Sequence, residues 1–572
     1  MYFLNIIPLI SFFGHVIFFS QKTGIQRQNA VPIVTSLLIL VLYFFAYIKL
    51  ILLATILLYI FGLWSIYDSY KQGLKLNQLI TEPLTTGIFL GIALIAGFYY
   101  QGAQFTLIED FKIWGIASKE LLTRHSIESG STLTSISDMY AVFPRGIAML
   151  HYFFMLPSGF FEGGALYAQF LIATSFLWPF FRNQNLYRSG IYVLALMCIG
   201  AMTASFLRSL VNEAIIGFAL SSIFLIYSTE EKDENLLYKL TPIFLVIPLI
   251  NQGAIILSVF WAAIISNLYL NLLKKDKLGI SRDHLLSYAL IFAPVMLYTL
   301  LGLIYDFLHP TQTPIHSDGS NIYNEIFGIL TLLKKIIFIS IKEGALLVFA
   351  LIYVTHMLTK KESTKLHKEY IEWMRDILTI LAGFGVYLLV IHYGKYDAIH
   401  DGVLYRSFAP IFILTASISL FFVEKTSLEH KQKIGLNLLC AFATVTLLYN
   451  IDRVSTIISL EEEELNSQIK KIEEHISKGT VVEISFENKS NNDNCYILAY
   501  NMSPFMNNEQ ILQCINHPIS YRSYNLGKIS NIPNEVEKNC KIIFKPFLLS
   551  HEVECEAPQQ IGDEIAPVTL NN

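Results

Sequence analysis

The stretch "VPIVTSLLILVLYFFAYIKLILLATILLYIFGLWSIY" (residues 31–67) decides the fold, because it is apolar throughout and carries a single charge, Lys49. As one helix it would be about 55 Å long, nearly twice the hydrocarbon thickness of a bilayer. We therefore predict a hairpin of two membrane spans.

The whole chain shares this character. Its 572 residues are 53% hydrophobic with a mean hydropathy of +0.49, and 15% are charged, against roughly 25% in soluble domains. The net charge of −4 argues against a nucleic-acid partner, and the chain has no Walker motif or dinucleotide fingerprint. These features predict an all-α polytopic membrane protein.

A membrane span needs about 20 apolar residues, and about fourteen runs qualify. The predicted spans are 3–20, 31–47, 50–67, 83–100, 161–181, 190–206, 211–228, 238–250, 254–273, 285–305, 342–358, 376–393, 406–423 and 434–450. Two further segments, 143–159 and 325–341, are interpreted as helices lying in the membrane interface, although the first is an alternative fifteenth span.

Alternate loops are rich in Lys and Arg. They read "QKTGIQRQ", "YKQGLK", "FRNQNLYR", "EEKDENLLYK", "KKDKLGISRD", "TKKESTKLHK" and "EKTSLEHKQK". The positive-inside rule assigns this side to the cytoplasm. We expect an integral membrane protein whose opposite loops, including the long one at 101–160, face outward.

The sequence predicts two domains, a transmembrane domain at 1–450 and a small α+β extracytoplasmic C-terminal domain at 451–572. Within the second we predict a charged amphipathic helix at 454–476 and strands at 481–487, 495–500 and 540–547. Four of the six cysteines lie here: Cys495, Cys514, Cys540 and Cys555. Two disulfides in an oxidising compartment are expected, with zinc as the alternative.

The long outer loop begins with "LIEDFKIWGIASKEL" (107–121), which places Glu109, Asp110, Trp114, Lys119 and Glu120 at the end of a predicted span. Carboxylates at the edge of the hydrocarbon call for a reason, although a solvated helix end is the simpler alternative. The loop returns through "YAVFPRGIAMLHYF" (140–153), which carries Arg145 and His151.

Two shorter outer turns also concentrate polar side chains. The first, "FLRSLVNEAII" (206–216), contains Glu213, and the second, "HYGKYDAIHDGVLYRSFAP" (392–410), contains His400, Tyr405 and Arg406. Interfacial anchoring of the arginine is the alternative to a functional role.

These motifs resemble the GT-C superfamily of integral-membrane glycosyltransferases, of the protein mannosyltransferase and aminoarabinose transferase type. Their first outer loop has the form D-[DE]-x-x-x-W-x-x-x-[AS]-K-E followed by Y-P-P. Here it reads "EDFKIWGIASKE" (109–120) and "YAVFPRG" (140–146), so a single Pro144 replaces the proline pair.

The resemblance implies a bacterial inner (plasma) membrane enzyme with an extracytoplasmic active site. It would transfer a sugar with inversion from a polyprenyl-phosphate donor to a glycan, lipid or protein acceptor. The resemblance makes Asp110 the catalytic base, with Glu109 as the alternative. Donor and phosphate binding would fall to Arg406, Lys119, Arg145, Trp114 and Tyr405, and acceptor or supporting roles to Glu120, His151, Glu213 and His400. No metal ligand is assigned and no cofactor is expected; a divalent metal stays open, although no DxD motif supports it.

Two other functions compete. A transporter or flippase of lipid-linked saccharides would carry charges deep within spans and paired repeats, which the sequence does not show. An O-antigen-type polymerase or ligase would place its large outer loop late in the chain, whereas the motif-bearing loop here comes early.

Overall fold

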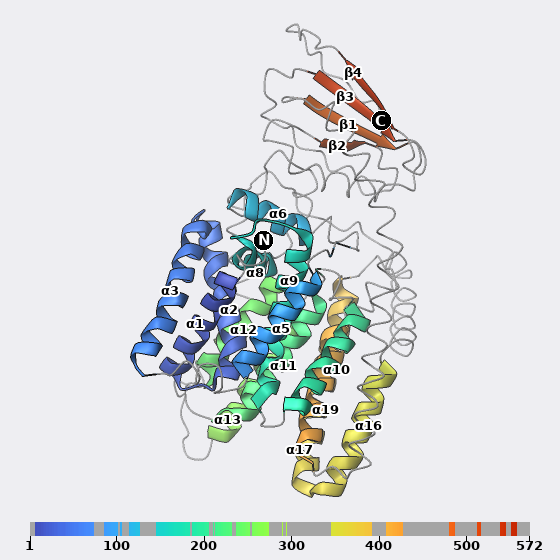
Figure 1. The fold of residues 1–572 in the computed structure, drawn as a ribbon. Coiled ribbons are helices and arrows are strands. Elements are labelled where there is room, and N and C mark those ends of the chain that lie inside the picture. Colours follow the sequence, from blue (N-terminus) through green and yellow to red (C-terminus); the bar gives the residue numbers. More distant parts are fainter. Residues whose placement is uncertain are drawn as a thin grey trace, which may run out of the picture. The chain divides into compact units, whose positions relative to one another are not determined.

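The computed structural model describes most of the first 270 residues and parts of the remainder (Figure 1). The described residues are 6–73, 85–100, 103, 105, 114–125, 145–182, 186–204, 210, 212–231, 236–251, 254–273, 289, 293, 345–391, 408–426, 480–486, 512–515, 538–544 and 551–556. The chain divides into two compact units: the first comprises residues 1–110, 117–127 and 143–453, and the second comprises residues 111–116, 128–142 and 454–572, which include the four strands.

The described chain is mostly helical. The helices are α1 Ile6–Thr23, α2 Arg27–Tyr47, α3 Ile51–Lys71, α5 Thr85–Tyr99, α6 Gly115–Arg124, α8 Gly146–Met155, α9 Glu162–Leu177 with the 3-10 turn η4 Trp178–Arg182, α10 Leu186–Ala204, α11 Glu213–Thr229, α12 Leu236–Ile250, α13 Ile255–Leu273, α16 Ala345–Glu362, α17 Thr364–Ile391 and α19 Ala409–Glu424.

The hairpin predicted at 31–67 is confirmed, because α2 and α3 pack against each other and are separated by three residues. Lys49 has a left-handed backbone (φ 60°). Its amide donates to the Ala46 carbonyl (3.2 Å), and the amide of Leu50 donates to that of Phe45 (2.8 Å). This pair of bonds is a Schellman motif, which satisfies the last carbonyls of α2 and turns the chain back.

Helices α1 and α3 cross where each carries a glycine. A Cβ added to Gly62 would collide with the Ser11 carbonyl, so the two backbones approach closely only because Gly62 has no side chain. Ser11 and His15 each hydrogen-bond to the Leu58 carbonyl, at 3.1 and 3.0 Å, and reinforce the crossing.

Four described helical segments are long and apolar enough to cross a membrane: Ile6–Thr23, Arg27–Tyr47, Ile51–Lys71 and Glu162–Phe181. Seven further apolar helical segments of the described chain are shorter, at 10–17 residues. The predicted spans at 285–305 and 434–450, and the surface helix at 325–341, fall almost wholly outside the described residues.

Helix α17 begins much earlier than the span predicted at 376–393. Its first half was expected to be a basic loop, but a stripe of Tyr370, Trp373, Ile377 and Ile380 is buried at helical spacing. Trp373 packs edge-on against Phe224, with ring centroids 4.8 Å apart. Burial of this stripe therefore stabilises the helix as far back as Thr364. Only Ser363 separates α17 from α16.

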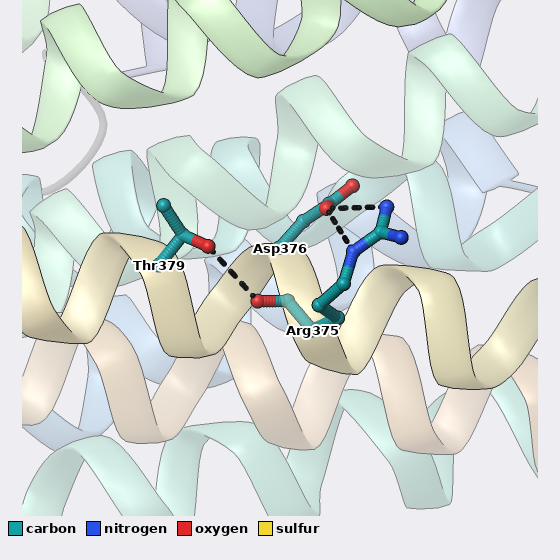
Figure 2. Close-up of polar contacts among 3 residues, drawn as sticks. All are labelled: Arg375, Asp376 and Thr379. Atoms are coloured by element: carbon teal, nitrogen blue, oxygen red, sulfur yellow. Dashed lines mark hydrogen bonds and ion pairs between the residues drawn. The ribbon is translucent and has the colours of Figure 1, made fainter.

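The opposite face of α17 is partly exposed and carries a local ion pair. Figure 2 shows Arg375 bending toward the neighbouring Asp376, with 3.1 Å between its guanidinium and the carboxylate, while Thr379 bonds back to the Arg375 carbonyl. The Arg375 side chain is 70% exposed. Such an exposed pair contributes little to stability.

The second unit contains a four-stranded sheet of β1 Thr480–Phe486, β2 Leu512–Ile515, β3 Lys538–Phe544 and β4 His551–Glu556. The strand order is β2-β1-β3-β4, in which β1 runs parallel to both neighbours and β3 and β4 are antiparallel. The strands predicted at 481–487 and 540–547 correspond to β1 and β3. The predicted strand at 495–500 and helix at 454–476 lie outside the described residues.

Candidate functional site

Several of the predicted site residues gather where α6, α8 and the start of α9 meet. Figure 1 shows α6 and α8 at one end of the helix bundle. Lys119 belongs to α6 and His151 belongs to α8, while Arg145 directly precedes α8. We call the residues Ser118, Lys119, His151 and Glu162 the candidate site.

Helix α8 lies inside the bundle instead of on its surface. All ten of its residues are buried, and it packs against α2, α9 and α12. An interfacial helix would leave one face open, whereas every residue of α8 is buried, so this part of the sequence prediction needs correction. At about 15 Å it is also too short to be a fifteenth span.

A buried hydrogen-bond chain ties α6, α8 and α9 together. The side chain of His151 accepts a bond from Ser118 at Nδ1 (2.7 Å) and contacts the amide oxygen of Gln169 through Nε2 (3.3 Å). The Gln169 oxygen requires a proton on Nε2, so the Ser118 hydroxyl donates to Nδ1. Burial lowers the pKa of His151 to about 4, against a raising effect of the Gln169 bond, so the ring is neutral at pH 7.

The other end of α6 is fixed to α8 by a second histidine. His125 follows the last residue of α6 with a left-handed backbone (φ 55°), and its amide closes the helix on the Leu121 carbonyl at 2.9 Å. Its Nδ1 lies 2.7 Å from the Tyr152 hydroxyl. Helix α6 is therefore attached to α8 at Ser118 and again at His125. The two contacts fix the orientation of the helical segment between them.

Lys119 is the cation that this arrangement positions. Its Nζ lies 5.9 Å from the centre of the Phe160 ring, a cation–π geometry, and it interacts electrostatically with Glu162. Burial lowers the pKa of Lys119 to about 8, and the Glu162 carboxylate opposes that shift. The ammonium is thus mostly charged at pH 7 but easily neutralised at mildly alkaline pH.

Glu162 opens α9 and also holds the incoming chain. Its Oε2 accepts a hydrogen bond from the Phe105 amide at 2.7 Å, fifty-seven residues earlier in the sequence. A carboxylate in the first turn of a helix also matches the positive end of the helix dipole. Glu162 consequently connects the residues before α6 to the start of α9.

Arg145 and Glu213 both lie near the end of α12. Arg145 directly precedes α8 and is buried, with its backbone near the Tyr43 hydroxyl. Gly146 touches the Leu249 carbonyl so closely that a Cβ would not fit. The side-chain amide of Asn212, which directly precedes Glu213, donates to the carbonyl of Ile250, the residue after Leu249, at 3.2 Å. Two predicted site segments far apart in the sequence are therefore brought to one place.

The remaining predicted residues divide into two groups. Trp114 directly precedes α6 and is half-buried, and Glu120 lies within α6, where its backbone alone is described. Five lie outside the described residues: Glu109, Asp110, His400, Tyr405 and Arg406.

Four residues of this cluster were not predicted from the sequence: Ser118, Tyr152, Glu162 and Gln169. Gln169 carried a usable signal, because it is a polar residue in the middle of an apolar run. Glu162 carried another, as an acid at the start of a predicted span. The hydroxyl groups carried none, since Ser and Tyr occur throughout the apolar segments.

Within the described ranges, no three His, Cys, Asp or Glu side chains gather closely enough to hold a metal ion. Comparison with known protein families, with curated protein sequences and with solved structures gives no match for this chain.

Proposed function

We propose that the chain is a polytopic membrane glycosyltransferase that moves a sugar from a polyprenyl-phosphate donor to an acceptor on the extracytoplasmic side. The observation that carries the proposal is the motif "EDFKIWGIASKE" (109–120), whose lysine lies in a built, partly buried environment at the end of the bundle. The helical fold, with four apolar segments of membrane-spanning length, is compatible with this function.

The cations Lys119 and Arg145 suit the leaving group of this reaction. When the bond between the anomeric carbon and the phosphate oxygen breaks, negative charge develops on the lipid phosphate, and positioned cations stabilise it. Lys119 is held by Phe160 and Glu162 and is charged at pH 7. Arg145 supplies a second buried guanidinium at the same end of the bundle.

The proposed chemistry is a single displacement. The carboxylate of Asp110 takes the proton of the acceptor hydroxyl, whose oxygen attacks the anomeric carbon while the phosphate departs, so the configuration inverts. In this scheme Arg406 binds the phosphate with two parallel hydrogen bonds, which a guanidinium can form and an ammonium cannot. Trp114, Tyr405, Glu120, Glu213 and His400 would contact the sugar or the acceptor.

The test is transfer of labelled sugar from a polyprenyl-phosphate donor in membranes carrying the protein. Arg406→Ala should lose most activity, and Arg406→Lys nearly as much, because the paired contact requires the planar fork. Arg375→Ala is the matched control, since it removes an exposed arginine that is paired only locally. Unchanged transfer in Arg406→Ala, at equal expression, would remove Arg406 from the mechanism.

Absence of transfer from every polyprenyl-phosphate sugar offered would count against the function itself. A flippase would instead move labelled donor across the bilayer without forming product. Product analysis of the same membranes therefore separates transfer from translocation.

A further inference from the structure

The strand register of the second unit pairs two of its cysteines. In the antiparallel pair of β3 and β4, Cys540 and Cys555 are direct partners. Partners in an antiparallel pair lie on the same face of the sheet, with Cα atoms about 4.5 or 5.5 Å apart, depending on the type of pair. Both separations fall within the roughly 4.4–6.8 Å that a disulfide spans.

The same register excludes Cys514 as the partner of either. Cys514 lies on β2 opposite Ile484 of β1, and Cys540 lies on β3 opposite Val482 of the same strand. Strand β1 therefore separates the two cysteines by two strand spacings, about 9.6 Å. Their positions along β1 also differ by two residues. Cys555 is one strand further away.

We infer that Cys540 and Cys555 form a disulfide that links the edge strand β4 to β3. Strand β4 pairs with β3 alone within the described sheet, so a covalent link between them secures an edge strand. If Cys495 and Cys514 are also bonded, the pairing is 495–514 and 540–555, one of the three that four cysteines permit. This inference is independent of the proposed glycosyl transfer.

Formation of the bond needs an oxidant, which we take to be a protein disulfide of the thiol oxidoreductase class. The two thiols lose two protons and two electrons, and the disulfide of the oxidoreductase accepts them to become a dithiol. Such oxidants act in extracytoplasmic compartments.

Trypsin can distinguish the pairings directly. Cleavage after Lys489, Arg522, Lys538 and Lys541 leaves Cys540 in peptide 539–541 and Cys555 in peptide 542–572, while Cys495 and Cys514 share peptide 490–522. The inferred bond joins 539–541 to 542–572. Either alternative pairing of all four cysteines would join both of those peptides to 490–522.

The experiment is mass spectrometry of full-length protein purified without reductant, with thiols blocked by N-ethylmaleimide before digestion. We expect the 539–541/542–572 product and its loss after reduction. In Cys555→Ser, peptide 539–541 should instead carry the maleimide on Cys540. Cys198→Ser, a change in the buried part of α10, should leave the product in place.

Two outcomes would overturn the inference. One is recovery of both Cys540 and Cys555 as blocked thiols from natively purified protein, which includes the case in which they hold zinc. The other is a bond from either residue to peptide 490–522.

Discussion

At the scale of single residues, the candidate site depends on one ammonium group that is partly removed from water. Lys119 lies over the Phe160 ring and interacts electrostatically with the Glu162 carboxylate, and burial lowers its pKa to about 8. Its charge is therefore retained below pH 8 and lost as the pH rises through that value, well before an exposed lysine would titrate.

The first prediction follows from this titration. If the ammonium stabilises the leaving phosphate, the rate of transfer falls as the pH rises through about 8. Lys119→Arg keeps its charge and should move the alkaline fall to higher pH. Glu162→Gln removes the group that raises the lysine pKa and should move the fall to lower pH. The measurement is kcat/KM against pH for the three proteins, and superimposable profiles would contradict it.

The second prediction concerns the buried hydrogen bond between Ser118 and His151. Ser118→Ala or His151→Ala removes one partner and leaves the other buried without its hydrogen bond. This should lower the free energy of unfolding by about 1–3 kcal/mol for each lost partner. The double variant should lose less free energy of unfolding than the two single variants together, because the second change removes a group that has already lost its hydrogen bond. Denaturant unfolding of the four solubilised proteins gives the cycle, and additive values would show that the two residues act separately.

The same histidine gives stability a pH dependence. Its folded pKa of about 4 lies below the unfolded value of 6.5. The neutral ring is therefore fully favoured above pH 6.5, and this contribution is lost as the pH falls toward 4.

At the scale of elements, close helix packing carries the third prediction. Gly62→Ala would place a methyl group against the Ser11 carbonyl, and relieving that contact should cost about 1–3 kcal/mol of the free energy of unfolding. Gly91→Ala on α5 is the matched control, because a Cβ there meets nothing within 4 Å. The measurement is the unfolding midpoint of each variant. Equal midpoints would contradict the close approach of the α1 and α3 backbones at Gly62.

The elements show where sequence reasoning succeeds. The α2–α3 hairpin was predictable because its length and apolarity alone exclude a single span. The start of α17 was not, since a run of lysines before Tyr370 indicates a loop until the buried stripe of Tyr370 and Trp373 is seen. Similarly, the composition of α8 favours an interface, and only its neighbours reveal that it is enclosed.

The candidate site divides in the same way. The sequence draws attention to Lys119, Arg145 and His151, because charged or titratable groups beside apolar runs are uncommon and require a partner. Their partners Ser118, Gln169 and Phe160 come from other segments, so the choice among many similar residues depends on packing that no local pattern encodes. The proximity of Asn212 to the end of α12 is of the same non-local kind.

At the scale of the whole molecule, hydrogen bonds bring together the ends of helices that flank three of the basic segments. The carboxylate of Glu230, which follows α11, accepts hydrogen bonds from the backbone amide of Gln26 (3.1 Å) and the side chain of Asn29 (2.7 Å). Gln26 lies between α1 and α2, and Asn29 lies in the first turn of α2. Ser69 at the end of α3 donates to Gln21 at 3.2 Å. The basic segment at 21–28 therefore contacts Ser69, which directly precedes the segment at 70–75, and Glu230, which begins the segment at 230–239.

The fourth prediction tests the proposed sidedness. Cysteines introduced at the exposed positions Gln72 and Glu231 should resist a membrane-impermeant maleimide in intact cells and react after permeabilisation. Ser158→Cys, next to α8, should react in both conditions. Labelling is read on the corresponding peptides, so native cysteines do not interfere. Reaction of Gln72→Cys in intact cells would reverse the topology.

The most direct test of the central claim is the effect of Asp110→Asn on sugar transfer from a polyprenyl-phosphate donor in membranes. The substitution keeps the shape of the side chain and removes its basicity, so we predict a fall of about 100- to 10,000-fold in the transfer rate, with donor binding and expression unchanged. Glu109→Gln, the adjacent control, should cost less. Wild-type turnover in Asp110→Asn would contradict the account and return the acidic pair to the role of a solvated helix end.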